Sequence, residues 1–471
     1  MLTAFAAALP SLAFAVCEPT FENLPRSLAR TWTPIPQHLP GVGEDTLWQH
    51  PSDESGHALH VHHVTNKRAL RDAGMSPESL NTRHEYSQHS AFSATGRWLI
   101  SHGIKQRILF DGLEYKPKRV IRHAGKLHDW YWDPLNDDIA FYISKTENAV
   151  MRYDVNSDSH TPVFSAEHLA AALGIENAAQ FKLEGSYGQG GLSSDGNRLV
   201  TKFARGADAH VVVFNPHSSE LIAHEQFPGM AGVRKMDWQV MSPSGDWVLI
   251  LGEFDPIYGT QFAVGRGVKQ VRAFRVEGLR KDSSRLISGR PAHLDLMRTE
   301  SGQELVVFAG AQSPNGWEGL STQPRGLVQG LYTVHIDGTN WRKRIDFRHH
   351  FEVGQPAAHV SASPEDARVL LSFYQGGNPD DVADAQNTPL LLVDLSDSAD
   401  TQTAWLGWDL AANPGIGDSS RGYLAQPHAS FSPNVTFASG DRGIKVVWAS
   451  DNNQRNLAVG NMVVAEVVCP S

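Results

Sequence analysis

The chain has 471 residues, of which 41% are hydrophobic and 20% charged, a composition typical of an ordered globular protein and not of a disordered one. The formal net charge of -10 argues against nucleic acid as a partner, because phosphate binding needs a basic surface. No apolar run is long enough to predict a membrane span. The 41 Gly and 26 Pro residues indicate many turns.

The first fifteen residues have the composition of a signal peptide. They are apolar and end in Ala13-Phe14-Ala15, the small-x-small pattern that a signal peptidase cuts. A basic segment before the apolar run is absent from this stretch, so a buried N-terminal strand or a misassigned start is the alternative. We predict that residues 1–15 are removed and that residues 16–471, a single catalytic domain, are secreted or periplasmic.

A strand, a tight turn and a second apolar strand recur along the rest of the chain. The copies lie at 89–100, 128–143, 190–203, 237–251, 293–308, 359–373 and 428–439. They are roughly forty to seventy residues apart, as expected when each copy contributes one four-stranded blade. The sequence therefore predicts an all-β fold, a seven-bladed β-propeller in a single closed ring.

Two further segments complete this prediction. Residues 166–179 have the pattern of a short helix, the only one expected. Residues 18–64 precede the first repeat and are expected to supply an outer strand to the last blade, which closes the ring. The two cysteines, Cys17 and Cys469, lie near the two ends. They form either a disulfide that joins the termini in an oxidising compartment or two unpaired thiols.

Histidines recur at one position of the repeat. The residues that open the seven turns are Ser93, Asp133, Ser193, Ser242, Met297, Ser363 and Ser432. The residues four positions earlier are His89, Asp129, Gln189, Trp238, His293, His359 and His428. Side chains in one register point to one level of the channel, so the four histidines indicate a functional site. The alternative is a structural role between neighbouring inner strands.

The last three of these histidines come from consecutive repeats. Three neutral imidazoles with one open position form the pattern of a catalytic Zn²⁺ site, and imidazole also binds Mn²⁺. We predict a divalent metal, Zn²⁺ or Mn²⁺ with Ca²⁺ as an alternative, bound by His293, His359 and His428. Gln426 adds an oxygen ligand, and Asp295 either binds the metal or supports a ligand.

Groups suited to acid–base chemistry lie in the first three repeats. His89 and His128 are candidate proton carriers, because a histidine titrates near neutral pH. Tyr187 is a candidate proton donor, and Arg205 is suited to clamp a carboxylate. We assign substrate contacts to Gln189, Asp237, Trp238, Arg421 and Tyr423.

Several segments resemble the β-propeller polysaccharide lyases, especially the oligogalacturonate and ulvan lyases. They are residues 236–250, 292–308, 358–363 and GYLAQPHASFSPN at 422–434. The resemblance implies a metal on His293, His428 and Gln426, and catalysis by His89, His128, Tyr187 and Arg205. It also implies β-elimination at a 4-linked uronic acid, with an anionic polysaccharide or oligosaccharide as substrate. Arg205 or the metal would neutralise the carboxylate, and a histidine would remove the C5 proton.

Two other classes of protein fit the same sequence. One is a non-catalytic periplasmic propeller that binds glycans or proteins, in which the histidines are structural. The other is a different metal-dependent enzyme, because a propeller constrains architecture more than chemistry. In each case we expect a monomer.

Overall fold

The structure is a computed structural model. It describes residues 45–49, 58–64, 89–102, 107–121, 127–185, 190–232, 234–254, 270–280, 283–288, 293–310, 330–346, 356–364, 367–375, 389–396, 402–408, 429–438, 442–450 and 461–468. No helix within these ranges is long and apolar enough to cross a bilayer.

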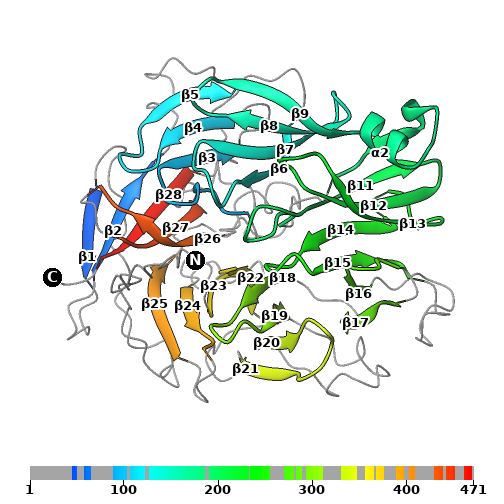
Figure 1. The fold of residues 1–471 in the computed structure, drawn as a ribbon. Coiled ribbons are helices and arrows are strands. Elements are labelled where there is room, and N and C mark those ends of the chain that lie inside the picture. The colour runs from blue at the N-terminus through cyan, green and yellow to red at the C-terminus, as the bar shows by residue number, and fades with distance from the viewer. Residues whose placement is uncertain are drawn as a thin grey trace, which may run out of the picture.

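Antiparallel sheets are arranged in a ring, and all except the closing sheet are built from strands that follow one another in the chain (Figure 1). Five of them have four strands each. Their strands are β6–β9 (Leu127–Trp132, Ile139–Ser144, Ala149–Asp154, Ser159–Ser165), β10–β13 (Phe181–Leu183, Leu199–Arg205, Asp208–Phe214, Leu221–Phe227), β14–β17 (Met236–Met241, Trp247–Gly252, Gln270–Arg275, Arg285–Ser288), β18–β21 (His293–Arg298, Glu304–Gly310, Gly330–His335, Arg342–Asp346) and β22–β25 (Pro356–Ala362, Arg368–Gln375, Pro389–Asp394, Gln402–Trp408). The all-β propeller predicted from the sequence is confirmed.

The closing sheet combines both ends of the described chain. Its order is β1 (Asp45–Gln49), β2 (Ala58–His63), β28 (Asn461–Val468), β27 (Arg442–Ser450) and β26 (Ser430–Thr436). β2 pairs with β28 so that His60 lies opposite Glu466. The predicted outer strand from residues 18–64 is therefore confirmed. Cys17 and Cys469 lie outside the described residues.

The predicted number of blades was wrong. Six sheets have the four or five strands of a complete blade, whereas the sheet of β3 (Trp98–His102), β4 (Arg107–Asp111) and β5 (Pro117–Ile121) has three. The structure is thus a ring of six blades, not seven. Ahead of β3, the first repeat contributes an isolated bridge between Phe92 and Leu99. There Ser90 donates its Oγ to the Phe92 carbonyl at 2.8 Å, a local bond that competes with strand pairing.

The hydrophobic core lies between neighbouring sheets, because inner-strand residues alternate between the two sides. On β14, Trp238 and Val240 pack with Phe308 of the next sheet, whereas Met241 packs with Val200 of the previous one. The predicted helix is confirmed over α2 (Ala166–Ala172), followed by the single turn η2 (Ala178–Gln180). α2 ends earlier than predicted, where Gly174 takes a φ of +66°.

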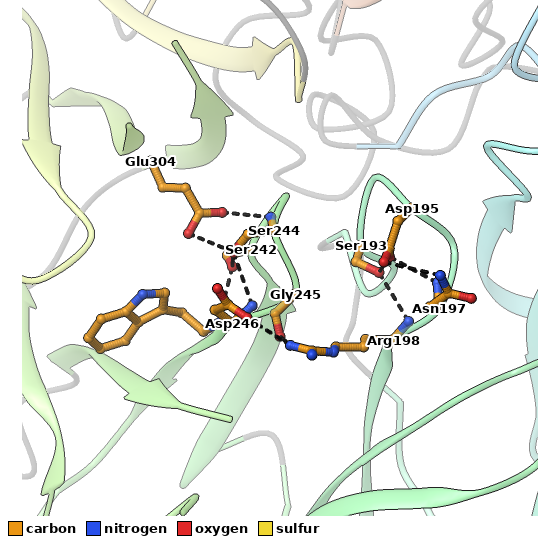
Figure 2. A network of polar contacts seen from close by, with 10 residues as sticks. Ser193, Asp195, Asn197, Arg198, Ser242, Ser244, Gly245, Asp246 and Glu304 are labelled. Carbon is orange, nitrogen blue, oxygen red and sulfur yellow. Dashed lines mark hydrogen bonds and ion pairs between the residues drawn. The ribbon is translucent and has the colours of Figure 1, made fainter. Parts of the chain in front are cut away.

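The turns that follow the inner strands connect one sheet to the next (Figure 2). Arg198 donates to Asp246 Oδ1 and to the Gly245 carbonyl, both at 2.8 Å. In the same turn, Ser244 donates its backbone N–H and its Oγ to the Glu304 carboxylate at 2.7 and 2.9 Å. These two hairpins are therefore each bonded to the blade that follows.

Replacing Glu304 with alanine is expected to lower the free energy of unfolding by about 1–2 kcal/mol, because two hydrogen bonds to a carboxylate are lost. Chemical denaturation measures the change. Glu300→Ala serves as the control, since Glu300 is exposed and lies in the adjacent turn. Equal stability of the two variants would show that the bonds to Ser244 do not join the blades.

Candidate functional site

Hydrogen bonds in the turns fix the register of the inner strands. Ser193 donates its N–H to the Arg198 carbonyl at 2.9 Å, and its Oγ accepts the Arg198 N–H at 3.0 Å. After β18 the same two bonds join Thr299 and Gln303, at 2.9 and 3.1 Å. Met297 was therefore the wrong alignment point, two residues too early. Counting back four from Thr299 reaches Asp295, which takes the place that the sequence alignment gave to His293.

Asp295 is a buried carboxyl that joins two inner strands. Its Oδ2 accepts the Ala362 N–H of β22 at 2.7 Å, and its Oδ1 accepts the Leu296 N–H at 2.8 Å. Burial raises the pKa of Asp295 to about 7, although both backbone bonds and the nearby His89 act in the opposite direction. Near neutral pH this carboxyl therefore exists in both protonation states.

Two of the predicted histidines lie on the strands that this carboxyl joins, His293 on β18 and His359 on β22, and a third, His89, interacts with it electrostatically. The His293 and His359 ring centroids are 4.3 Å apart. Burial lowers the pKa of His293 to about 4, so its imidazole is neutral at neutral pH. His89 is buried with its ring edge-on to Tyr131, at 5.3 Å between centroids. We call His89, His293, Asp295 and His359 the inner-strand cluster.

The structure describes two of the four predicted metal ligands. His293 and His359 are in ring contact, and a neutral imidazole is the form that binds a metal. His428 and Gln426 lie outside the described residues. Within the described ranges no group of three or more His, Cys, Asp and Glu residues is placed to hold a metal ion. The metal site stays a prediction.

A second polar group surrounds Lys202, which is fully buried. Its Nζ donates to the Met236 carbonyl at 2.6 Å and lies 3.2 Å from Glu184 Oε2. Burial lowers the pKa of Lys202, whereas Glu184, Asp237 and Asp129 act to raise it. We call Lys202, Glu184, Asp237 and Asp129 the Lys202 group. Its three carboxylates outnumber its single ammonium.

Two aspartates of this group lie at bulges in inner strands. The pairing of β6 shifts between His128 and Trp130, around Asp129, and that of β14 shifts between Met236 and Trp238, around Asp237. Asp129 takes a φ of 47°, a conformation that side chains other than glycine rarely adopt. The sequence pattern predicted Asp237 as a site residue and missed Lys202 and Glu184, because a lysine inside an apolar strand carries no signal of its charge partners.

The remaining predicted residues take different places. Arg205 donates its Nε to Gln180 at 2.9 Å, and its guanidinium lies 5.6 Å from the Phe181 ring centroid. Trp238 is buried in the core between two sheets. His128 lies in β6, in a part where the structure describes the backbone alone. Tyr187, Gln189, Arg421 and Tyr423 lie outside the described residues, so the predicted catalytic set stays a prediction.

Comparison with known proteins yields similar propellers and no family. No family model and no curated protein matches the chain. The WD40 domain of Neurospora crassa Pan2 is 11% identical, with 84% of this chain and 92% of that chain covered and a TM-score of 0.43. The Cps50 (Swd1) β-propeller domain of Myceliophteria thermophila is 14% identical, with 70% and 90% covered and a TM-score of 0.37.

A putative TolB from Agrobacterium tumefaciens is 15% identical, with 55% of this chain and 79% of that chain covered and a TM-score of 0.34. Likeness at this level concerns the fold alone, and the sheets described above already establish that fold.

Proposed function

We propose that this chain is a non-catalytic binding propeller that holds a hydroxyl-rich glycan at the inner-strand cluster. The observation that carries the proposal is the ring contact of His293 with His359, beside a buried Asp295 that bonds to β22 and interacts electrostatically with His89 of the first repeat. Burying a carboxyl and imidazoles is costly, and core packing alone does not need them. Such groups accept and donate hydrogen bonds to sugar hydroxyls, and Tyr131 adds an aromatic face.

The charge of the Lys202 group bears on which glycan is bound. Glu184, Asp129 and Asp237 share one ammonium, so an anionic polymer, the substrate class expected from the sequence, would meet like charge wherever it reaches this group. A neutral glycan avoids this repulsion. Export of the chain, inferred from residues 1–15, would place it where extracellular glycans occur.

Titration calorimetry with matched neutral and uronic oligosaccharides tests this proposal. We expect saturable binding of a neutral oligosaccharide that is lost in Asp295→Ala and retained in His217→Gln, because His217 is exposed in a turn outside the cluster. Binding that survives Asp295→Ala, or that is seen with uronic oligosaccharides alone, would refute the proposal. A protein ligand captured through the same residues would refute the glycan assignment and keep the binding role.

A second candidate, the uronate lyase, is favoured by one observation. Asp295 has a pKa of about 7 beside His89, and catalytic acids and bases work best when their pKa lies near the working pH. In this reading His89 or His128 removes the C5 proton, and a second group protonates the leaving oxygen. A divalent metal on His293, His359, His428 and Gln426 would stabilise the substrate carboxylate. Ultraviolet absorbance of an unsaturated uronate, formed by wild type and not by His128→Ala, would establish it.

A further inference from the structure

Two histidines away from the inner-strand cluster face each other across neighbouring strands. His210 lies on β12 and His224 on β13. Because His210 pairs with Gln226 and His224 with Val212, the two are diagonal neighbours in the sheet. His210 Nδ1 is 2.9 Å from His224 Nε2, and the rings are 14° from parallel with centroids 5.2 Å apart.

The surroundings hold His210 in place and leave His224 room to move. His210 is buried, and its ring packs edge-on against Phe181 at 5.1 Å. Its Nε2 is buried and has no hydrogen-bond partner among the described residues. His224 is half-buried. A buried imidazole beside a half-buried one is suited to binding an ion placed between them.

Both imidazoles are neutral at neutral pH. Burial lowers the pKa of His210 to about 4, and the His224 imidazole and Arg205 lower it further, whereas Asp208 raises it. Burial lowers the pKa of His224 as well. Neutral imidazole is the form that coordinates a metal, so neither ring has to lose an imidazolium proton. The proton of the hydrogen bond between His210 and His224 moves to the other nitrogen of its own ring when the metal binds.

The separation of the two nitrogens matches a chelate. Two metal–nitrogen bonds of about 2.1 Å that meet at a right angle hold their nitrogens about 3 Å apart. The observed separation is 2.9 Å. Two imidazoles with water in the other positions suit Cu²⁺ best, followed by Ni²⁺ and Zn²⁺.

We propose that His210 and His224 form a cross-strand chelate for a divalent transition metal, and that of these metals Cu²⁺ binds most tightly. Asp208 and Arg205 both lie close enough to interact electrostatically with His210, so the carboxylate attracts the bound cation and the guanidinium opposes it. The site lies on strands outside the inner-strand cluster and does not depend on the proposed glycan binding or on the predicted metal at His293.

Titration of the full chain with Cu²⁺ tests the proposal. We expect His224→Gln to bind one equivalent of Cu²⁺ fewer than wild type. Its electron paramagnetic resonance spectrum should lack a signal from two-nitrogen coordination that the wild-type spectrum contains. His217→Gln is the matched control, because it removes an exposed histidine of the same blade and leaves the pair intact. Its stoichiometry should equal that of wild type.

Two further measurements separate the proposal from other effects. His293→Gln removes a ligand of the other predicted site, and the equivalent that depends on His224 should persist in that variant. Thermal unfolding without metal verifies that His224→Gln folds as wild type does. If His224→Gln folds and binds as many equivalents as wild type, the two imidazoles form a simple hydrogen bond and the proposal is wrong.

Discussion

Replacing Lys445 with alanine is expected to lower the free energy of unfolding by about 3–5 kcal/mol, because it removes the ammonium from the buried Glu466 carboxylate, which then keeps the Tyr115 hydroxyl and the His62 imidazole, 3.5 Å away, as neighbours. Lys445 is fully buried where the closing sheet meets the turn after β4. Its Nζ donates to the Gly112 carbonyl at 2.7 Å and lies 3.4 Å from Glu466 Oε1. Tyr115 donates to the same carboxylate oxygen at 2.6 Å. Chemical denaturation of wild type and variant measures the loss.

A double variant separates charge from packing. Lys445→Met combined with Glu466→Gln removes both charges and keeps an amide oxygen that accepts from Tyr115. We expect it to recover much of the lost stability, because the main cost of the single change is the unpaired charge. A loss below about 1 kcal/mol for Lys445→Ala, the range of a solvated pair, would show that water reaches Glu466.

The second large effect is the pH dependence that Asp295 gives to stability. Its pKa is raised from 3.8 to about 7 in the folded chain, so between these values the folded state keeps a proton that the unfolded state has lost. This contribution is complete below pH 3.8 and disappears as the pH rises through 7. Over the whole interval it amounts to about 4 kcal/mol.

Asp295→Asn should abolish this slope, because the amide has no proton to lose in this range. Urea unfolding at about pH 5 and about pH 8 measures it, and the difference between the two conditions should shrink by roughly 3 kcal/mol in the variant. His293 acts in the opposite sense, since its pKa of about 4 removes stability as the pH falls below 6.5. Equal slopes in wild type and Asp295→Asn would show that the carboxyl is ionised when folded.

The parts of the fold that the sequence predicted correctly depend on local pattern. Alternating apolar residues and turn residues identified the inner strands, and the helical period identified residues 166–172. The number of complete blades depends on which segments hydrogen-bond to one another as strands. The local sequence pattern carries no information on that pairing. Ser90 uses its hydroxyl in a local hydrogen bond to the Phe92 carbonyl, and the first repeat keeps a bridge where a strand was expected.

The candidate site was predicted in part for a similar reason. His293 and His359 meet because period-two alternation survives a shift of two residues, so the error at Met297 left His293 on the correct side of β18. The same error hid the place of Asp295. The Lys202 group was missed because its members come from four different strands or loops, and their meeting depends on bulges at Asp129 and Asp237.

The closing sheet constrains how the chain is made. β2 pairs with β28, which is the last described strand to leave the ribosome. Until that moment β2 carries an unpaired edge, and so does β27 on the side that β28 will occupy. A nascent or truncated chain that lacks β28 therefore has two strands, β2 and β27, each with an edge whose backbone groups have not yet paired. Ring closure late in synthesis makes such chains prone to pair with one another, so that a nonsense mutation near the C-terminus would yield aggregates instead of a shortened working protein.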